Sequence, residues 1–171
     1  MATVTGRVRG GLLLLAAFDL VVAWLTFRLG ATSIMLFSIA SAALLGLAAL
    51  LAPTRPRALP ALLVGVAVAT FLRAIPQTGG AVDLGDVARY AVPVGFLLAA
   101  ARRRVGPAWL PLAGVALVAV ARSYFVAFYL AAGATTLVVG NVLGAAGAWL
   151  WATALLPGQA DAPSEDAPSA G

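Results

Sequence analysis

The sequence predicts an all-α membrane protein, a polytopic bundle of about six transmembrane helices without a soluble domain. Two observations predict this fold class. Of the 171 residues, 63% are hydrophobic and 10% are charged, whereas a soluble domain has about 45–50% apolar residues. The apolar residues also gather in runs that approach the roughly 20 residues of a spanning helix. Because these runs lack the alternation of barrel strands, helices are the structure that satisfies their backbone hydrogen bonds in lipid.

Six apolar runs follow one another along the chain, separated by short segments rich in proline, glycine and arginine. They cover residues 10–27, 31–52, 59–75, 87–101, 110–132 and 135–156. The first run carries Asp19 and continues into Arg28 without a small-residue cleavage site, so we expect a retained helix and not a signal peptide. The fourth run is the shortest and follows Asp83 and Asp86, whose carboxylates suit a helix N-cap. Whether residues 87–101 cross the whole membrane stays open.

The runs divide the chain into three regions. Residues 1–9 form an N-terminal segment, residues 10–156 the transmembrane domain and residues 157–171 a C-terminal tail. The tail contains the sequence Asp-Ala-Pro-Ser twice and has almost nothing apolar to bury, so it is expected to be acidic and disordered.

The arginines predict the orientation in the cell membrane, because cytoplasmic loops carry an excess of basic residues. With the N-terminus inside, the outer side holds only Arg28, Arg73 and Arg89, and both termini are cytoplasmic. The cytoplasmic side then holds seven arginines: Arg7, Arg9, Arg55, Arg57, Arg102, Arg103 and Arg104. The three outer arginines fit the rim of a vestibule that attracts anions, but we expect them to snorkel to the membrane surface.

The residue inventory excludes several classes of chemistry. The chain has no cysteine, histidine or lysine, so it cannot form a disulfide, a Cys/His zinc site or a lysine Schiff base. Outside the tail the only carboxylates are Asp19, Asp83 and Asp86, and no hydrolase motif is present. We therefore expect no cofactor, no metal site and no enzymatic activity. No basic cluster is longer than Arg102 to Arg104, so nucleic acid is not an expected partner.

Two charged residues stand inside predicted spans, where an isolated charge costs about 2.5–3.5 kcal/mol or more. Asp19 and Arg122 lie at the same depth below the outer ends of their helices, so we predict that they form an ion pair. Asn141 lies close to the same layer, and Tyr129 shares a helical face with Arg122. This cluster fits a structural pair or a ligand site for a carboxylate or phosphate, and the structural pair is preferred.

Small residues form stripes on two predicted helices. Gly140 and Gly144 form a GxxxG element in the last helix, and Ser38, Ala42 and Gly46 form a stripe in the second. Such stripes let helix backbones approach closely, so we expect helix packing there, inside the bundle or at a subunit contact. A short echo also exists, since Gly-Val-Ala precedes Arg73 and Arg122 at the same spacing; chance is preferred over duplication.

Two functions fit these observations. The preferred one is a non-catalytic membrane module or accessory subunit in the lipid bilayer, which packs against a membrane-protein partner or a second copy through its Gly/Ala faces. The alternative is a small transporter or solute-binding component with an outward-facing cavity around Arg122 that takes a small anionic ligand. The environment of Arg122 separates them, because a dry Asp19 pair indicates the module and free guanidinium donors in a pocket indicate solute binding.

Overall fold

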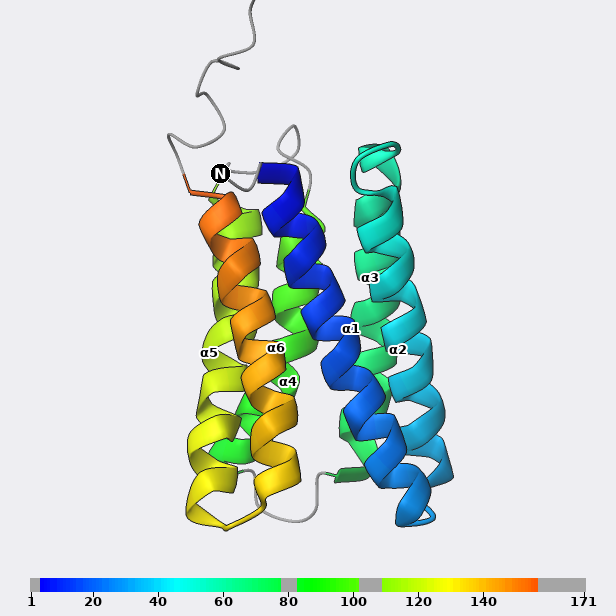
Figure 1. Ribbon diagram of the computed structural model, residues 1–171, viewed down its shortest axis with the longest axis vertical. Helices are drawn as coiled ribbons and strands as arrows, with labels where there is room; N and C mark the ends of the chain where they lie inside the picture. Colours follow the sequence, from blue (N-terminus) through cyan, green and yellow to red (C-terminus); the bar gives the residue numbers. More distant parts are fainter. Residues whose placement is uncertain (1–3, 78–82, 102–108, 157–171) are drawn as a thin grey trace, which may run out of the picture.

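The computed structural model describes residues 4–77, 83–101 and 109–156, and within these ranges it contains six α-helices and no strand. The all-α prediction is therefore confirmed for this part of the chain. Two short 3₁₀ helices, η1 (Pro56–Ala58) and η2 (Ile75–Gln77), flank the third α-helix. The six helices are α1 (Val4–Arg28), α2 (Thr32–Leu51), α3 (Leu59–Ala74), α4 (Leu84–Ala99), α5 (Leu110–Ala131) and α6 (Thr135–Ala154) (Figure 1).

Five of the helical stretches in the described ranges are long and apolar enough to cross a membrane, which indicates a multi-pass membrane protein. They are α1, α2, α5, α6 and the continuous stretch formed by η1, α3 and η2. The exception is α4, which has 16 residues and contains Pro93. It corresponds to the fourth and shortest apolar run, residues 87–101.

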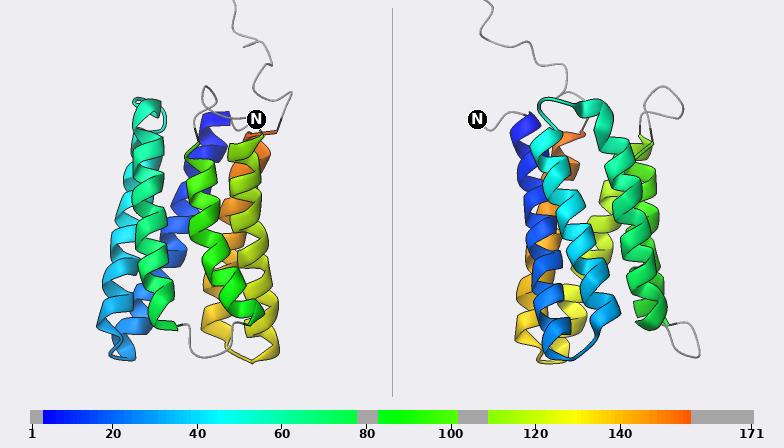
Figure 2. Two further views of the ribbon diagram at one scale, coloured as in Figure 1. Left: turned by 180° about the vertical axis from the view of Figure 1, so that it is seen from behind. Right: turned by 90° about the vertical axis from the view of Figure 1, so that its right-hand side faces the viewer.

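The six helices form a closed ring in sequence order. Each helix packs mainly against its neighbours along the chain, and α6 returns to pack against α1 (Figures 1 and 2). The turns after α1 and α5 use Gly30 and Gly133, whose φ angles of 71° and 69° suit glycine. Both turns lie at the end of the bundle away from the N-terminus of α1 (Figure 1), which we call the distal end.

The ring has an apolar exterior and a partly polar interior. Large apolar side chains such as Leu20, Leu36 and Val120 are exposed on the outside. The buried set includes these polar or charged residues: Asp19, Ser38, Ser41, Thr70, Arg73, Asp86, Arg122 and Asn141. An apolar surface around buried charges is unfavourable in water but suits lipid, which indicates membrane insertion.

Glycines close two seams of the ring. A Cβ atom added to Gly114 of α5 would lie 2.4 Å from the carbonyl oxygen of Gly95 in α4. One added to Gly147 of α6 would lie 2.7 Å from the carbonyl oxygen of Gly11 in α1. At both seams the backbones of two helices are in direct contact, as small residues permit in membrane proteins.

The predicted packing stripes lie mostly within the bundle. An added Cβ at Gly140 would meet Val21 of α1 at 3.1 Å, and Gly144 faces α1 in the same way. Ser38 and Ala42 are buried. Gly46 departs from the prediction, because a Cβ added there would meet nothing within 4 Å.

The helix boundaries refine two further predictions. Helix α1 begins at Val4, so Arg7 and Arg9 lie in its first turns and not in a segment before it. Asp83 caps α4 as predicted: its side chain accepts a hydrogen bond from the Asp86 N–H at 2.8 Å, and the Asp86 side chain accepts one from the Asp83 N–H at 3.4 Å. The triplet Arg102 to Arg104 and the tail 157–171 lie outside the described residues.

Candidate functional site

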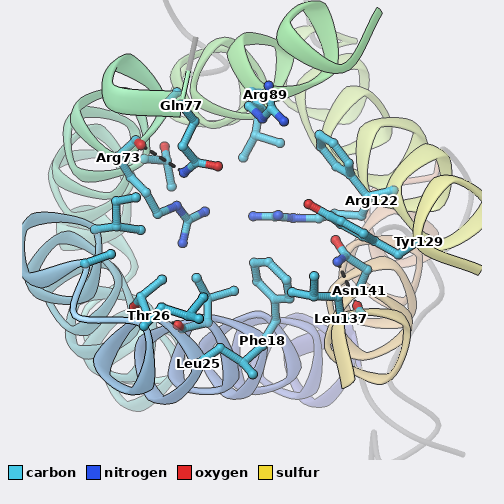
Figure 3. A pocket seen from close by; sticks show the side chains of 18 residues that line it. Phe18, Leu25, Thr26, Arg73, Gln77, Arg89, Arg122, Tyr129, Leu137 and Asn141 are labelled. Atoms are coloured by element: carbon cyan, nitrogen blue, oxygen red, sulfur yellow. Dashed lines mark hydrogen bonds between the residues drawn. The ribbon is translucent and has the colours of Figure 1, made fainter. Parts of the chain in front are cut away.

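A cavity of about 330 Å³ lies inside the ring near the distal end (Figure 3). All six helices contribute to its lining, which reaches Leu29, Ala31 and Gln77 at the distal ends of their segments. Three arginines are among the lining residues: Arg73, Arg89 and Arg122. They come from three successive helices, and Figure 3 shows Arg73 and Arg122 extending toward each other across the cavity.

Arg73 is neutralised by a buried carboxylate. Its Nη1 donates to Oδ1 of Asp19 at 2.6 Å and to Oγ of Ser38 at 3.3 Å. The second oxygen of Asp19 accepts a hydrogen bond from Oγ of Ser41 at 2.5 Å. Asp19 is only 2% exposed, and both of its oxygens have hydrogen-bond partners inside the protein. This network ties α1, α2 and α3 together.

Arg89 is neutralised within its own helix. Its Nη1 donates to Oδ1 of Asp86 at 2.5 Å, three residues earlier in α4. The Arg89 side chain is 25% exposed, whereas Asp86 is buried and also takes part in the cap of α4. The pair therefore stands at the edge of the cavity with one member accessible.

Arg122 has no such partner. It is 5% exposed, yet it makes no hydrogen bond or ion pair with any residue in the described part of the chain. Its Nε is buried without an acceptor. The guanidinium lies over the ring of Phe18, 3.8 Å from the ring centroid. Such a cation–π contact is worth up to about 2 kcal/mol, but it leaves the in-plane N–H donors unsatisfied.

Asn141 is the second residue with an unsatisfied group. Its Nδ2 donates to the carbonyl oxygen of Leu137 at 2.9 Å, which fixes the orientation of the amide. Its Oδ1 is buried without a donor, although a buried polar atom normally has a partner. Tyr129 lies beside Arg122 and Asn141 in Figure 3 and stacks on Phe125 with ring centroids 5.9 Å apart.

The predicted ion pair between Asp19 and Arg122 is wrong, because Asp19 pairs with Arg73. The depth estimate placed Asp19 and Arg122 at one level, but depth along a helix does not decide which arginine faces Asp19. The position of Ser41 on α2 directs the carboxylate toward α3, where Arg73 completes the network.

The three predicted outer arginines have different environments. Arg28 is exposed and lies over Trp24 at 5.4 Å, outside the cavity lining. Arg73 was expected to snorkel outward, but its side chain is buried and points inward to Asp19. Arg89 lines the cavity at its edge. The cavity and its immediate contacts therefore hold three arginines and two carboxylates, which leaves one uncompensated positive charge on Arg122.

Sequence reasoning placed Asp19 and Arg122 in one layer but missed that Arg73 lies in the same layer. Gly11 precedes Asp19 by the same eight residues that separate Gly65 from Arg73 and Gly114 from Arg122. Since α1, α3 and α5 run in the same direction in the ring (Figure 1), this spacing would have placed all three charges at one level. No sequence pattern of this kind marks Ser41, which contacts Asp19, or Phe18, which contacts Arg122.

Comparison with family models, with curated proteins and with solved structures gives no match for this chain. We therefore infer a function from the chemistry of the cavity.

Proposed function

We propose that this chain is a solute-binding membrane protein that holds a small anion in the distal cavity. The observation that carries the proposal is the guanidinium of Arg122, which is buried among apolar helices with no carboxylate partner in the described residues. In the predicted orientation, with both termini in the cytoplasm, the cavity opens to the outside of the cell.

The energetics of a buried charge support this proposal. A charge without a partner inside a membrane helix costs about 2.5–3.5 kcal/mol or more, so a protein that retains one usually uses it. Arg presents a planar fork of N–H donors that matches carboxylate and phosphate oxygens. An anion in the cavity would satisfy the guanidinium of Arg122 and cancel the one uncompensated charge.

The environment of the small residues favours solute binding over the accessory-module hypothesis. Gly140 and Gly144 face α1 of the same chain, and Ser38 is engaged by Arg73. These positions are thus occupied by contacts within the bundle and leave little of the Gly/Ala stripes for a partner helix.

We propose binding without catalysis, since Asp19 and Asp86 are both engaged by arginines and supply no free acid or base at the cavity.

The test compares the loss of two arginines that carry the same charge. Wild type, Arg122→Gln and Arg28→Gln are purified in detergent, and their Tm values are measured with benzoate, acetate, phosphate or sulfate at constant ionic strength. A bound ligand stabilises by about 2.7 kcal/mol at 100 times its Kd. We expect at least one anion to raise the Tm of wild type and of Arg28→Gln, and none to raise that of Arg122→Gln. Equal responses from all three proteins, or no response from wild type, would show the proposal to be wrong.

A further inference from the structure

We infer that the anion is a small organic monocarboxylate that combines an apolar body with a hydrogen-bond donor, such as a hydroxyl or amide group. This inference rests on the proposed function and specifies the class of ligand for the same cavity. Three independent features of the cavity carry it: the number of unpaired charges, the character of its walls and the orphaned oxygen of Asn141.

The charge of the cavity selects a single negative charge. Arg73 and Arg89 are already held by Asp19 and Asp86 at 2.6 Å and 2.5 Å. Arg122 alone lacks a carboxylate, so one negative charge brings the cluster to neutrality. A second negative charge on the ligand would have to displace a carboxylate from its arginine or remain unpaired in a poorly solvated site, and both are unfavourable.

The walls of the cavity select an apolar body. Between the polar groups the lining consists of aromatic and branched aliphatic side chains, among them Phe18, Val22, Leu25, Ile34, Val92 and Phe125. A volume of about 330 Å³ is at the lower end of the range for small-molecule pockets and exceeds the need of a single inorganic ion. Phosphate or sulfate would leave these walls facing water, whereas an apolar body would cover them.

The unpaired oxygen of Asn141 selects a donor on the ligand. Oδ1 is only an acceptor, and the Nδ2 contact with Leu137 prevents an exchange of the two amide ends. Thr26, Thr70 and Gln77 are already used as donors: the two threonines donate to carbonyl oxygens of their own helices, and Gln77 donates to the carbonyl oxygen of Arg73. The hydroxyl of Tyr129 also lines the cavity (Figure 3), but it makes no hydrogen bond to Oδ1 of Asn141. A ligand hydroxyl or amide N–H would therefore satisfy an atom that the described residues leave unpaired.

The experiment uses compounds that differ in one feature at a time. Binding of benzoate, 3-hydroxybenzoate, 4-hydroxybenzoate, terephthalate, benzamide and inorganic phosphate to the full chain in detergent is measured by calorimetry. Laurate distinguishes a membrane-derived carboxylate from a water-soluble one. We expect benzoate to bind at least tenfold more tightly than terephthalate, benzamide, phosphate and laurate. One of the hydroxybenzoates should bind about three- to tenfold more tightly than benzoate, as one added hydrogen bond allows.

Two variants assign these effects to residues. Arg122→Gln should abolish the binding of every carboxylate, and Asn141→Leu should bind benzoate and the hydroxybenzoates equally. The hydroxyl effect in wild type stands even if Asn141→Leu does not fold. Equal affinities of benzoate and both hydroxybenzoates in wild type would overturn the role of Asn141, for instance because Asn141 pairs with Nε of Arg122 instead.

The outcomes separate this inference from the proposed function. If terephthalate or phosphate binds as tightly as benzoate and still requires Arg122, the monocarboxylate assignment fails and the anion site remains. Tightest binding of laurate would replace the water-soluble ligand by a lipid-derived one. If no anion binds, or binding does not depend on Arg122, the proposed function fails as well.

Discussion

The two sides of the ring each bury one arginine, but only one of these arginines has a carboxylate partner. On one side, Arg73 of α3 follows Gly65-Val-Ala and is fully engaged by Asp19 and Ser38. On the other, Arg122 of α5 follows Gly114-Val-Ala at the same spacing and has only the face of Phe18. The difference lies in what the neighbouring helices offer, since α2 supplies Ser41 to orient the carboxylate and α6 supplies an amide. The paired Arg73 stabilises the fold, and we propose that the unpaired Arg122 binds a ligand.

The largest expected effect comes from removing the carboxylate of the engaged side. Asp19→Asn leaves Arg73 buried without a counterion, and removal of one partner of a buried pair costs about 3–5 kcal/mol. Arg122→Gln, by contrast, removes a charge that has no partner, so we expect no loss of stability or a small gain. Thermal unfolding of both variants in detergent, without added anion, measures the contrast. A loss in Arg122→Gln as large as in Asp19→Asn would mean that the two arginines are structurally equivalent.

A double variant tests whether Asp19 and Arg73 form one unit. Asp19→Asn combined with Arg73→Gln leaves no stranded charge, and the two amides can hydrogen-bond to each other. We expect the double variant to be more stable than Asp19→Asn by about 1–3 kcal/mol, which is the range of coupling between contacting residues. Asp19→Asn combined with Arg122→Gln is the matched control, and it should recover less. Equal recovery in both double variants would show that Asp19 is not specific for Arg73, and larger recovery with Arg122→Gln would support the pairing with Arg122 that the sequence had suggested.

The glycine seams support the ring on both sides and give a smaller effect. Gly114→Ala places a Cβ 2.4 Å from the backbone of α4, so α4 and α5 must separate, and overpacking of this kind costs about 1–3 kcal/mol. Gly46→Ala is the control, because its Cβ would meet open space and alanine favours the helix by up to about 1 kcal/mol. The Tm values of the two variants should therefore shift in opposite directions. A neutral Gly114→Ala would show that the seam is not tight.

The sequence predicted the helices well and their mutual arrangement poorly. Runs of apolar residues predicted the six helices in order, and the carboxylate of Asp83 before the fourth run predicted its cap. Both are local properties of the sequence. The partner of Asp19 depends on how each helix is rotated about its axis, and that rotation is set by contacts such as Gly11 with Gly147. Arg73 was misplaced for the same reason, since its distance from the helix end does not show whether its side chain points inward or outward. The cavity itself, and the unpaired Arg122 within it, follow only from the assembled ring.

The smallest expected loss of stability comes from removing the carboxylate that pairs with Arg89, the third arginine of the cavity. The same variant also tests how the charge of the cavity affects ligand binding. Asp86→Asn removes the counterion of Arg89, but that side chain is 25% exposed, and pairs with such access to solvent contribute about 0–1 kcal/mol. The asparagine can still accept the hydrogen bond from the Asp83 N–H that closes the cap of α4. The loss should thus stay below about 1 kcal/mol in thermal unfolding. The cavity would then carry two uncompensated positive charges in place of one, so the affinity for terephthalate should rise relative to that for benzoate.

Arg28→Ala is the control, since it changes the net charge of the protein by the same amount in the opposite direction at a site outside the cavity. An unchanged preference for benzoate in Asp86→Asn would show that the walls of the cavity, and not its charge, exclude the second carboxylate.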